Sequence, residues 1–301
     1  MSAGDGGGRG GVRGTALVTG ASSGIGAAVA AALVRRGYRV YGTSRDPRKV
    51  GSPVAGVTYL PLDLADDASI EACAAAAGDV DVLINNAGES QSGPFEELPM
   101  DAVRRLFQLN VFGAVRLSQL VLPGMRERGR GRVVMVGSML ASFPLTYRSS
   151  YVASKAAIKG FASAARREYA PYGVWVATVE PGSVATGISA RRTQYVAEGS
   201  PFRGAYDTML AALNRNEARG VSAEKVAAKV VGVVEAGRPR GFYAVGSGAP
   251  VVFAVRRVVS RGVSEGLVAR RHGLPPAGGG FLAGFGAGAG RWGFSRRSPR
   301  P

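Results

Sequence analysis

The sequence predicts an α/β protein: a single doubly wound domain with a parallel sheet of about seven strands and helices on both faces. Short apolar segments alternate along the chain with longer helical ones, which is typical of parallel strands joined by crossover helices. Polar or glycine-rich motifs follow most of the apolar segments, where strands would end. The 301 residues, 46% of them hydrophobic, suffice for one large core.

The apolar run at residues 15–18 predicts the first strand, and an Ala-rich segment after a glycine motif predicts a helix that stops at Gly37. Further strands are predicted where β-branched and apolar residues cluster, at residues 38–45, 57–64, 80–84, 132–136, 174–179 and 242–245. Helices are predicted between them at about 66–77, 100–128, 151–172 and 222–236.

The chain ends differ in composition from the middle. We expect a flexible Gly-rich leader at residues 1–13, one domain at 14–272 and a disordered Gly/Arg-rich tail at 273–301. Within the domain, residues 187–220 form an irregular helical insertion, which we expect to shape a substrate site.

A glycine motif, TGASSGIG at residues 19–26, joins the first strand to the first helix. In this position glycines let the backbone approach a pyrophosphate, and the helix N-terminus offers unpaired N–H groups. The motif also fits the G-x-S-x-G turn of a serine hydrolase. A hydrolase needs a base, and His272 is the only histidine, so a dinucleotide site is the favoured interpretation.

An arginine stands at the end of the second predicted strand. In dinucleotide folds an acidic residue there binds the ribose 2′-hydroxyl of NAD(H), whereas an arginine accommodates the 2′-phosphate of NADP(H). Arg45 therefore favours NADP(H). Asp46 follows directly and keeps NAD(H) as an alternative.

Tyr151 and Lys155 are one turn apart on a predicted helix and share a face. A phenol is a poor acid or base at neutral pH, but an ammonium beside it favours the phenolate. Tyr151 could then exchange a proton during a reaction. An isolated Tyr-x-x-x-Lys pair is more often a solvated helix face, so this interpretation depends on the other motifs.

The composition limits the classes of partner. A net charge of +17 would attract anionic partners, such as nucleic acid or an anionic membrane. The basic residues are spread through the chain without aromatic interleaving, so we predict no specific nucleic-acid binding. One cysteine and one histidine predict no metal site. Without a membrane-spanning run or an N-terminal secretory signal, the sequence predicts a cytoplasmic protein.

Residues 250–271 alternate apolar residues with arginines, which predicts a pair of basic amphipathic helices. Packing of their apolar side on the core is the simpler interpretation. Weak contact with an anionic membrane surface is the alternative.

Together the motifs resemble the short-chain dehydrogenase/reductase family over about residues 14–245, and so imply a Rossmann-type fold. The resemblance rests on motifs in the family's order and approximate spacing: the glycine motif, the turn Asn85-Asn86-Ala87-Gly88, Asn110, Ser138, the pair Tyr151 and Lys155, and the turn Pro181-Gly182. Thr43-Ser44-Arg45 and the segment around Glu180 are most similar to NADP(H)-preferring members that act on hydroxysteroids and retinoids.

The resemblance implies hydride transfer between NADP(H) and a carbonyl or alcohol, with Tyr151 as general acid/base. It implies that Ser138 hydrogen-bonds the carbonyl oxygen, that Lys155 holds the cofactor ribose, and that Asn110 holds a water in a proton relay. The implied cofactor-binding residues are Gly20, Ser22, Ser23, Gly24, Ile25, Gly26, Arg45, Asp63, Leu64, Asn86, Ala87, Gly88, Tyr151, Lys155, Pro181, Gly182, Val184 and Thr186.

We therefore expect an NADP(H)-dependent oxidoreductase that interconverts a ketone or aldehyde and an alcohol. A lipophilic substrate, such as a steroid, a retinoid or a fatty-acid derivative, is expected from apolar residues near the predicted pocket, namely Phe143, Leu145, Tyr147, Tyr195, Phe202 and Met209.

A 3-oxoacyl-thioester reductase is the enzyme alternative, since an acidic acyl carrier would suit the basic surface. A non-catalytic dinucleotide-binding protein is the remote alternative. The resemblance also implies a homo-oligomer, a dimer or tetramer.

Overall fold

Seven parallel strands form the central sheet of the computed structural model, which describes residues 12–275. Their order is β3-β2-β1-β4-β6-β7-β9. The strands are β1 Thr15–Val18, β2 Arg39–Ser44, β3 Val57–Pro61, β4 Val82–Asn85, β6 Gly131–Val136, β7 Val174–Pro181 and β9 Phe242–Val245. Strand order runs outward in opposite directions from the junction of β1 and β4, so the predicted doubly wound fold is confirmed.

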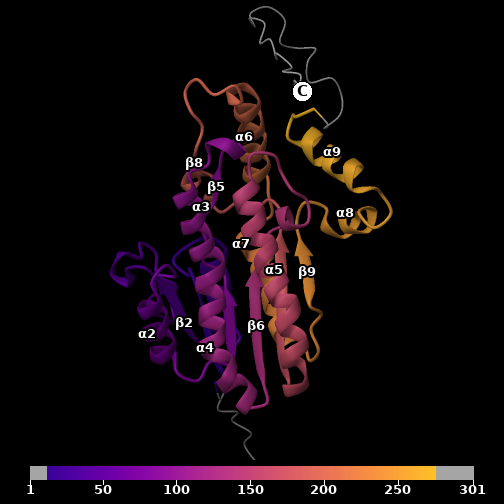
Figure 1. The fold of residues 1–301 in the computed structure, drawn as a ribbon. Coiled ribbons are helices and arrows are strands. Elements are labelled where there is room, and N and C mark those ends of the chain that lie inside the picture. The colour runs from indigo at the N-terminus through magenta and orange to yellow at the C-terminus, as the bar shows by residue number, and fades with distance from the viewer. Residues whose placement is uncertain (1–11, 276–301) are drawn as a thin grey trace, which may run out of the picture.

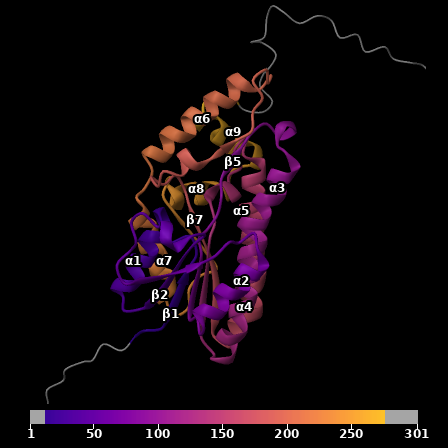
Figure 2. The same cartoon turned by 90° about the vertical axis from the view of Figure 1, so that its left-hand side faces the viewer.

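Helices cover both faces of the sheet (Figure 2). One layer consists of α1 Gly24–Arg35 and α7 Ala223–Glu235, and the other of α2 Asp67–Ala77, α4 Gly113–Glu127 and α5 Ser149–Tyr169. Side chains alternate between the faces of a strand. Accordingly Ala16 and Val18 pack with the first layer and Leu17 with the second.

Beyond the carboxyl ends of the strands, further helices gather at one end of the molecule (Figure 1). They are α3 Met100–Phe107, α6 Arg203–Ala218, α8 Ala249–Val255 and α9 Arg261–Arg271. The helix pair predicted for residues 250–271 is therefore present as α8 and α9. The predicted insertion at 187–220 holds a short 3₁₀ turn, β8 Thr193–Gln194 and α6.

Two features differ from the sequence-based expectation. The helix predicted at 100–128 is interrupted by a π-helical turn, Gln108–Phe112, between α3 and α4. In addition, β8 pairs with β5 Gln91–Ser92 in a small second sheet. Strands of two residues are too short to produce an alternating pattern that could have predicted them.

The predicted leader at 1–13 and tail at 273–301 fall largely on residues 1–11 and 276–301, outside the described residues. Leu274 is buried and packs with Tyr206 of α6. Across residues 12–275 no helix is long and apolar enough to cross a membrane. The same residues contain no group of three or more His, Cys, Asp or Glu that could hold a metal ion.

Candidate active site

The predicted site residues lie at one edge of the sheet. Because all seven strands are parallel, the loops after β1, β4, β6 and β7 emerge at the same edge. These loops carry the glycine motif, the Asn86 turn, Ser138 and the Pro181-Gly182 turn. The N-terminus of α5, with Tyr151, lies at this edge as well.

The glycine loop is held by close backbone contacts. Gly20 and Gly24 have φ of +66° and +56°, in the left-handed region that favours glycine. A Cβ at Gly26 would lie 2.2 Å from the Gly20 carbonyl oxygen and 2.5 Å from Asn86 Nδ2. Asn86 Nδ2 donates to the carbonyls of Thr19, at 3.0 Å, and Gly20, at 3.3 Å. The Asn86 side chain therefore holds the glycine loop in place at the start of α1.

A cleft of about 510 Å³ runs over this loop. Most of the predicted cofactor residues line it: Gly20, Ser22, Ser23, Gly24, Ile25, Arg45, Asp63, Leu64, Asn86, Ala87, Gly88, Tyr151, Lys155 and Thr186. Gly26 lies beneath the loop, and Pro181, Gly182 and Val184 line a neighbouring cavity instead. A cleft over a helix N-terminus and a glycine-rich loop suits a dinucleotide pyrophosphate.

Arg45 and Asp46 differ in their relation to the cleft. Arg45 lines it together with Ser44. Asp46 instead caps a 3₁₀ turn, accepting hydrogen bonds from the Arg48 backbone N–H and from Arg48 Nε, both at 3.1 Å. These bonds lower the pKa of Asp46 below its ordinary value. The carboxylate is thus occupied by its own turn, and the positive side chain faces the cleft.

Further polar side chains on the cleft wall were not predicted: Glu89, Arg105, Arg191 and Thr193. Arg191 Nη1 donates to Ser23 Oγ at 3.0 Å, which ties the insertion after β7 to the glycine loop. Arg191 follows the glycine loop by 168 residues. A pattern confined to neighbouring residues could not have revealed this contact.

Tyr151 and Lys155 lie one turn apart on α5, as predicted, and both are buried, with 9% and 7% of their surface exposed. Lys155 Nζ donates to the Val136 carbonyl at 3.0 Å and lies 5.9 Å from the centre of the Tyr151 ring. Ser138 follows β6 and caps a 3₁₀ turn, accepting from the Leu140 N–H at 3.2 Å. Because both side chains are buried, this Tyr/Lys pair is not part of a solvated helix face.

Asn110 sits in the π-helical turn and is 3% exposed. Its Oδ1 accepts from the Glu89 N–H at 2.8 Å, and its Nδ2 donates to the Glu89 carbonyl at 3.1 Å and to Ser154 Oγ at 3.2 Å. A Cβ at Gly88 would lie 2.9 Å from Asn110 Oδ1 and 3.6 Å from Lys155 Nζ. The widened turn therefore brings the Asn110 amide near Lys155, across a position that only glycine can occupy.

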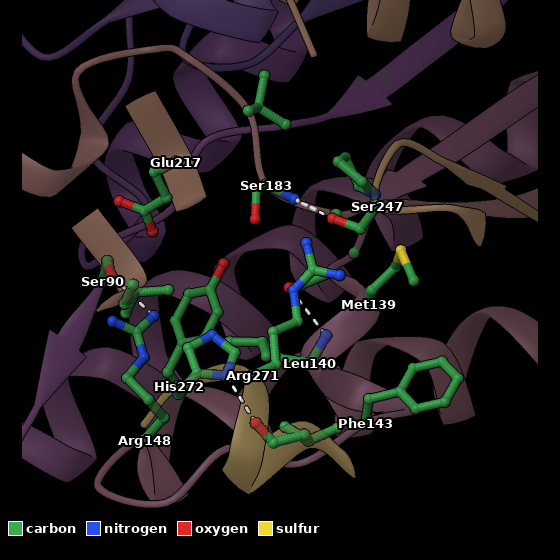
Figure 3. Close-up of a pocket in the computed structure, with 18 of the residues that line it drawn as sticks. Ser90, Met139, Leu140, Phe143, Arg148, Ser183, Glu217, Ser247, Arg271 and His272 are labelled. Atoms are coloured by element: carbon green, nitrogen blue, oxygen red, sulfur yellow. Dashed lines mark hydrogen bonds between the residues drawn. The ribbon is translucent and has the colours of Figure 1, made fainter. Parts of the chain in front are cut away.

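A second cavity of about 190 Å³ adjoins the cleft, and Tyr151 lines both. Figure 3 shows this cavity. Ser138 also lines it. Apolar side chains form much of its wall: Met139, Leu140, Phe143, Leu213, Val252 and Val268. Charged and polar side chains form another part: Ser90, Arg148, Glu217, Arg271 and His272.

Of the six apolar residues expected near this pocket, Phe143 lines the cavity and the other five do not. Leu145 and Met209 are buried in an apolar cluster that also contains the cavity residues Leu140, Leu213 and Val268. Tyr147 packs on Phe202. The wall is completed instead by Leu213 of α6, Val252 of α8 and Val268 of α9. Late helices fold back over the site, which no local pattern predicts.

His272, for which the sequence offered no partner, lies at the end of α9 and is 7% exposed. Its Nδ1 is 2.9 Å from the Val268 carbonyl oxygen. Burial lowers the pKa of His272 below its ordinary value, and the charges of Arg271 and Arg148 act in the same direction. The imidazole is therefore neutral at pH 7 and forms part of the cavity wall.

Comparison with known proteins agrees with this geometry. A family model described as short chain dehydrogenase matches residues 14–196. Retinol dehydrogenase 8 from Bos taurus is 34% identical, over 68% of this chain and 72% of that protein. The crystal structure of a short-chain dehydrogenase from Streptomyces avermitilis is 34% identical with a TM-score of 0.73, over 81% of this chain and 92% of that one. A short chain dehydrogenase from Burkholderia cenocepacia J2315, solved in complex with NADP, is 26% identical with a TM-score of 0.68, over 85% and 97%.

Gly26→Ala tests the architecture of the glycine loop. The added Cβ would collide with the Gly20 carbonyl oxygen, so we expect unfolding free energy to fall by about 1–3 kcal/mol and nicotinamide dinucleotide binding to be lost. Urea denaturation and a fluorescence titration measure the two effects. Gly160→Ala is the control, because a Cβ there meets no atom within 4 Å and alanine in a helix gains up to about 1 kcal/mol. Unchanged binding by Gly26→Ala would contradict the loop assignment.

Proposed function

The chain belongs to the short-chain dehydrogenase/reductase family, whose members are oxidoreductases that act on CH–OH groups with NAD(P)(H). From this premise we propose that it interconverts a ketone or aldehyde and an alcohol with NADP(H), on a lipophilic small molecule. The observation that carries the proposal is the position of Tyr151, which lines both the glycine-loop cleft and the apolar cavity beside it. A phenol at this junction can reach a substrate oxygen while a cofactor occupies the cleft.

The chemistry is assigned to four residues. Tyr151 protonates the carbonyl oxygen in reduction and removes the hydroxyl proton in oxidation. Ser138 donates a hydrogen bond to the same oxygen as negative charge develops on it. The Lys155 ammonium stabilises charge on Tyr151, and Asn110, near Lys155 across Gly88, orients a water that returns the proton. When bound, NADP(H) supplies or accepts the hydride.

The preference for NADP(H) is supported by charge at the cleft wall. Arg45 lines the cleft, whereas the Asp46 carboxylate is bonded to Arg48. A 2′-phosphate would be attracted by Arg45, while the ribose hydroxyls of NAD(H) would find no free carboxylate at Asp46. The solved relative in complex with NADP is consistent with this choice.

The lipophilic substrate is supported by the apolar side chains on the wall of the second cavity, among them Leu213, Val252 and Val268. The bovine relative is named for retinol, a lipophilic alcohol. Apolar walls of this kind favour a substrate whose non-reacting part is hydrocarbon.

We also propose that the protein is cytoplasmic and contacts an anionic membrane, which the helices α8 and α9 support. Large apolar side chains are exposed on these helices and on the turn between them, namely Val251, Val255, Val258, Val263 and Leu267. The intervening arginines are exposed too, including Arg257, Arg261 and Arg270. The same helices carry Val252 and Val268 on the cavity wall, so a lipid surface against them would lie next to the substrate site.

Cofactor choice is tested by titrating the protein with NADPH and NADH in parallel. We expect NADPH to bind more tightly, and Arg45→Ala to weaken NADPH about 10–100-fold with little change for NADH, because a charge-assisted hydrogen bond is lost. Arg39→Ala, an exposed arginine at the opposite end of β2, is the matched control. Equal or tighter binding of NADH by the unmodified protein would refute the preference.

Tyr151→Phe separates chemistry from binding. Removal of the hydroxyl should lower kcat by at least about 10²–10⁴-fold while NADPH affinity stays within about threefold. Tyr172→Phe, at an exposed tyrosine just after α5, should leave both quantities unchanged. Steady-state kinetics and nucleotide fluorescence measure the two, and substantial residual turnover by Tyr151→Phe would disprove the assigned proton transfer.

Membrane contact is tested by co-sedimentation with phosphatidylserine vesicles. Binding should occur at low salt and be reversed at high salt, since exposed charges are screened. The triple change Arg257→Gln, Arg261→Gln and Arg270→Gln should abolish it. The control is a second triple variant, which removes the same charge from other exposed positions: Arg35→Gln, Arg39→Gln and Arg126→Gln. Equal binding by the two triple variants would rule out α8 and α9 as the contact.

A further inference from the structure

Arg148 is a buried charge on the wall of the second cavity. It is 2% exposed, and it lines the cavity beside Tyr151. Its Nη2 donates to Ser90 Oγ at 3.0 Å, while Nε and Nη1 have no hydrogen-bond partner in the described part of the chain. A guanidinium normally uses its planar set of donors on carboxylates or carbonyls, so this one is incompletely satisfied.

No carboxylate among residues 12–275 forms an ion pair with Arg148, although the charge of Glu217 acts on it and counters part of the lowering of its pKa. Glu217, the acidic residue of the cavity wall, is paired with Arg192 at 2.5 Å. Arg271 adds a second guanidinium to the wall, and His272 is neutral. Arg148 also precedes the first turn of α5, whose dipole places further positive potential there.

The positive charge persists at neutral pH. Burial, together with the charge of Arg192, lowers the pKa of Arg148 to about 10, which leaves the guanidinium protonated at pH 7. A buried charge without a counter-ion is unfavourable in a folded protein. A ligand that brings an anionic group into the cavity would remove this cost, and a planar carboxylate matches the guanidinium best.

The position of Arg148 constrains the substrate. Its Cζ lies 4.4 Å from the centre of the Tyr151 ring. An anionic group bound at Arg148 would therefore lie next to the Tyr151 side chain. In Figure 3 the charged side chains Arg148 and Glu217 lie on one side of the cavity, and the apolar Met139 and Phe143 on the other.

We propose that the cavity is a carboxylate-binding subsite and that the substrates are oxo acids and the corresponding hydroxy acids with a hydrocarbon portion. Arg148 binds the carboxylate, and the hydrocarbon lies against Met139, Phe143 and Val252. This rests on the proposed function and narrows its substrate class, because neutral lipophilic alcohols leave Arg148 unpaired. Arg148 is a specificity residue here, and the proton transfer stays with Tyr151.

The kinetic test compares 2-oxo and 4-oxo acids of six to ten carbons with their methyl esters, reduced with NADPH. We expect kcat/KM to favour the acid at least about tenfold, and Arg148→Met to lower the acid-to-ester ratio about 10²-fold, as for loss of one partner of a buried charge pair. Ser90→Ala removes the hydroxyl at Nη2 but keeps the charge, and should retain the preference. Preference for esters by the unmodified protein, or an equal fall for acid and ester in Arg148→Met, would overturn the subsite.

A binding test is independent of turnover. Calorimetry with the unmodified protein should find that octanoate binds at least about tenfold more tightly than octanamide. The difference in affinity should be smaller in Arg148→Lys, which keeps the positive charge but lacks the planar set of guanidinium donors. Equal affinity for the two ligands would overturn the subsite even if neutral ketones were reduced. Absence of any NADPH-dependent reduction, with octanoate still preferred, would instead count against the proposed oxidoreductase chemistry alone.

Discussion

The common direction of the strands is the constraint on which the rest of the structure depends. In a parallel sheet each hydrogen-bonded neighbour must run the same way, so every strand needs a crossover and every loop at its carboxyl end returns to one edge. Residues as distant in sequence as Gly20 and Tyr151 thereby line a single cleft. The fold thus determines where the site lies, and the side chains at that edge determine which reaction it can support.

At that edge the chain departs from regular geometry in places that serve the site. The π-helical turn at Asn110 widens the helix, and Gly88 and Gly26 occupy positions where a Cβ would collide with neighbouring atoms. Each departure is held by specific contacts, such as the bonds from Asn86 to the glycine loop. Irregular elements stabilised in this way are frequent at functional sites.

Tyr151 lines two pockets whose walls come from different parts of the chain. The cleft is built from loops that follow strands, whereas the second cavity is completed by α6, α8 and α9, which come last in the chain. The glycine motif and the Asn86 turn thus line the cleft, while Leu213, Val252 and Val268 of the late helices line only the second cavity. Arg148 lies beside Tyr151 on the wall of the second cavity, where we propose that it selects the substrate.

The sequence by itself determined the strand and helix order and the residues of the glycine loop, because hydrophobic periodicity and glycine spacing are local properties. It also placed Tyr151 and Lys155 on one helical face, since a helix repeats every 3.6 residues. It favoured Arg45 over Asp46 at the cofactor ribose but kept Asp46 as an alternative, because the two residues are adjacent at a strand end. Only the tertiary structure turned Asp46 toward Arg48, buried His272 against α9 and left Arg148 without a counter-ion. The physical reason is that these outcomes depend on contacts between segments that are remote in the chain, whose approach is set by packing rather than by any local pattern.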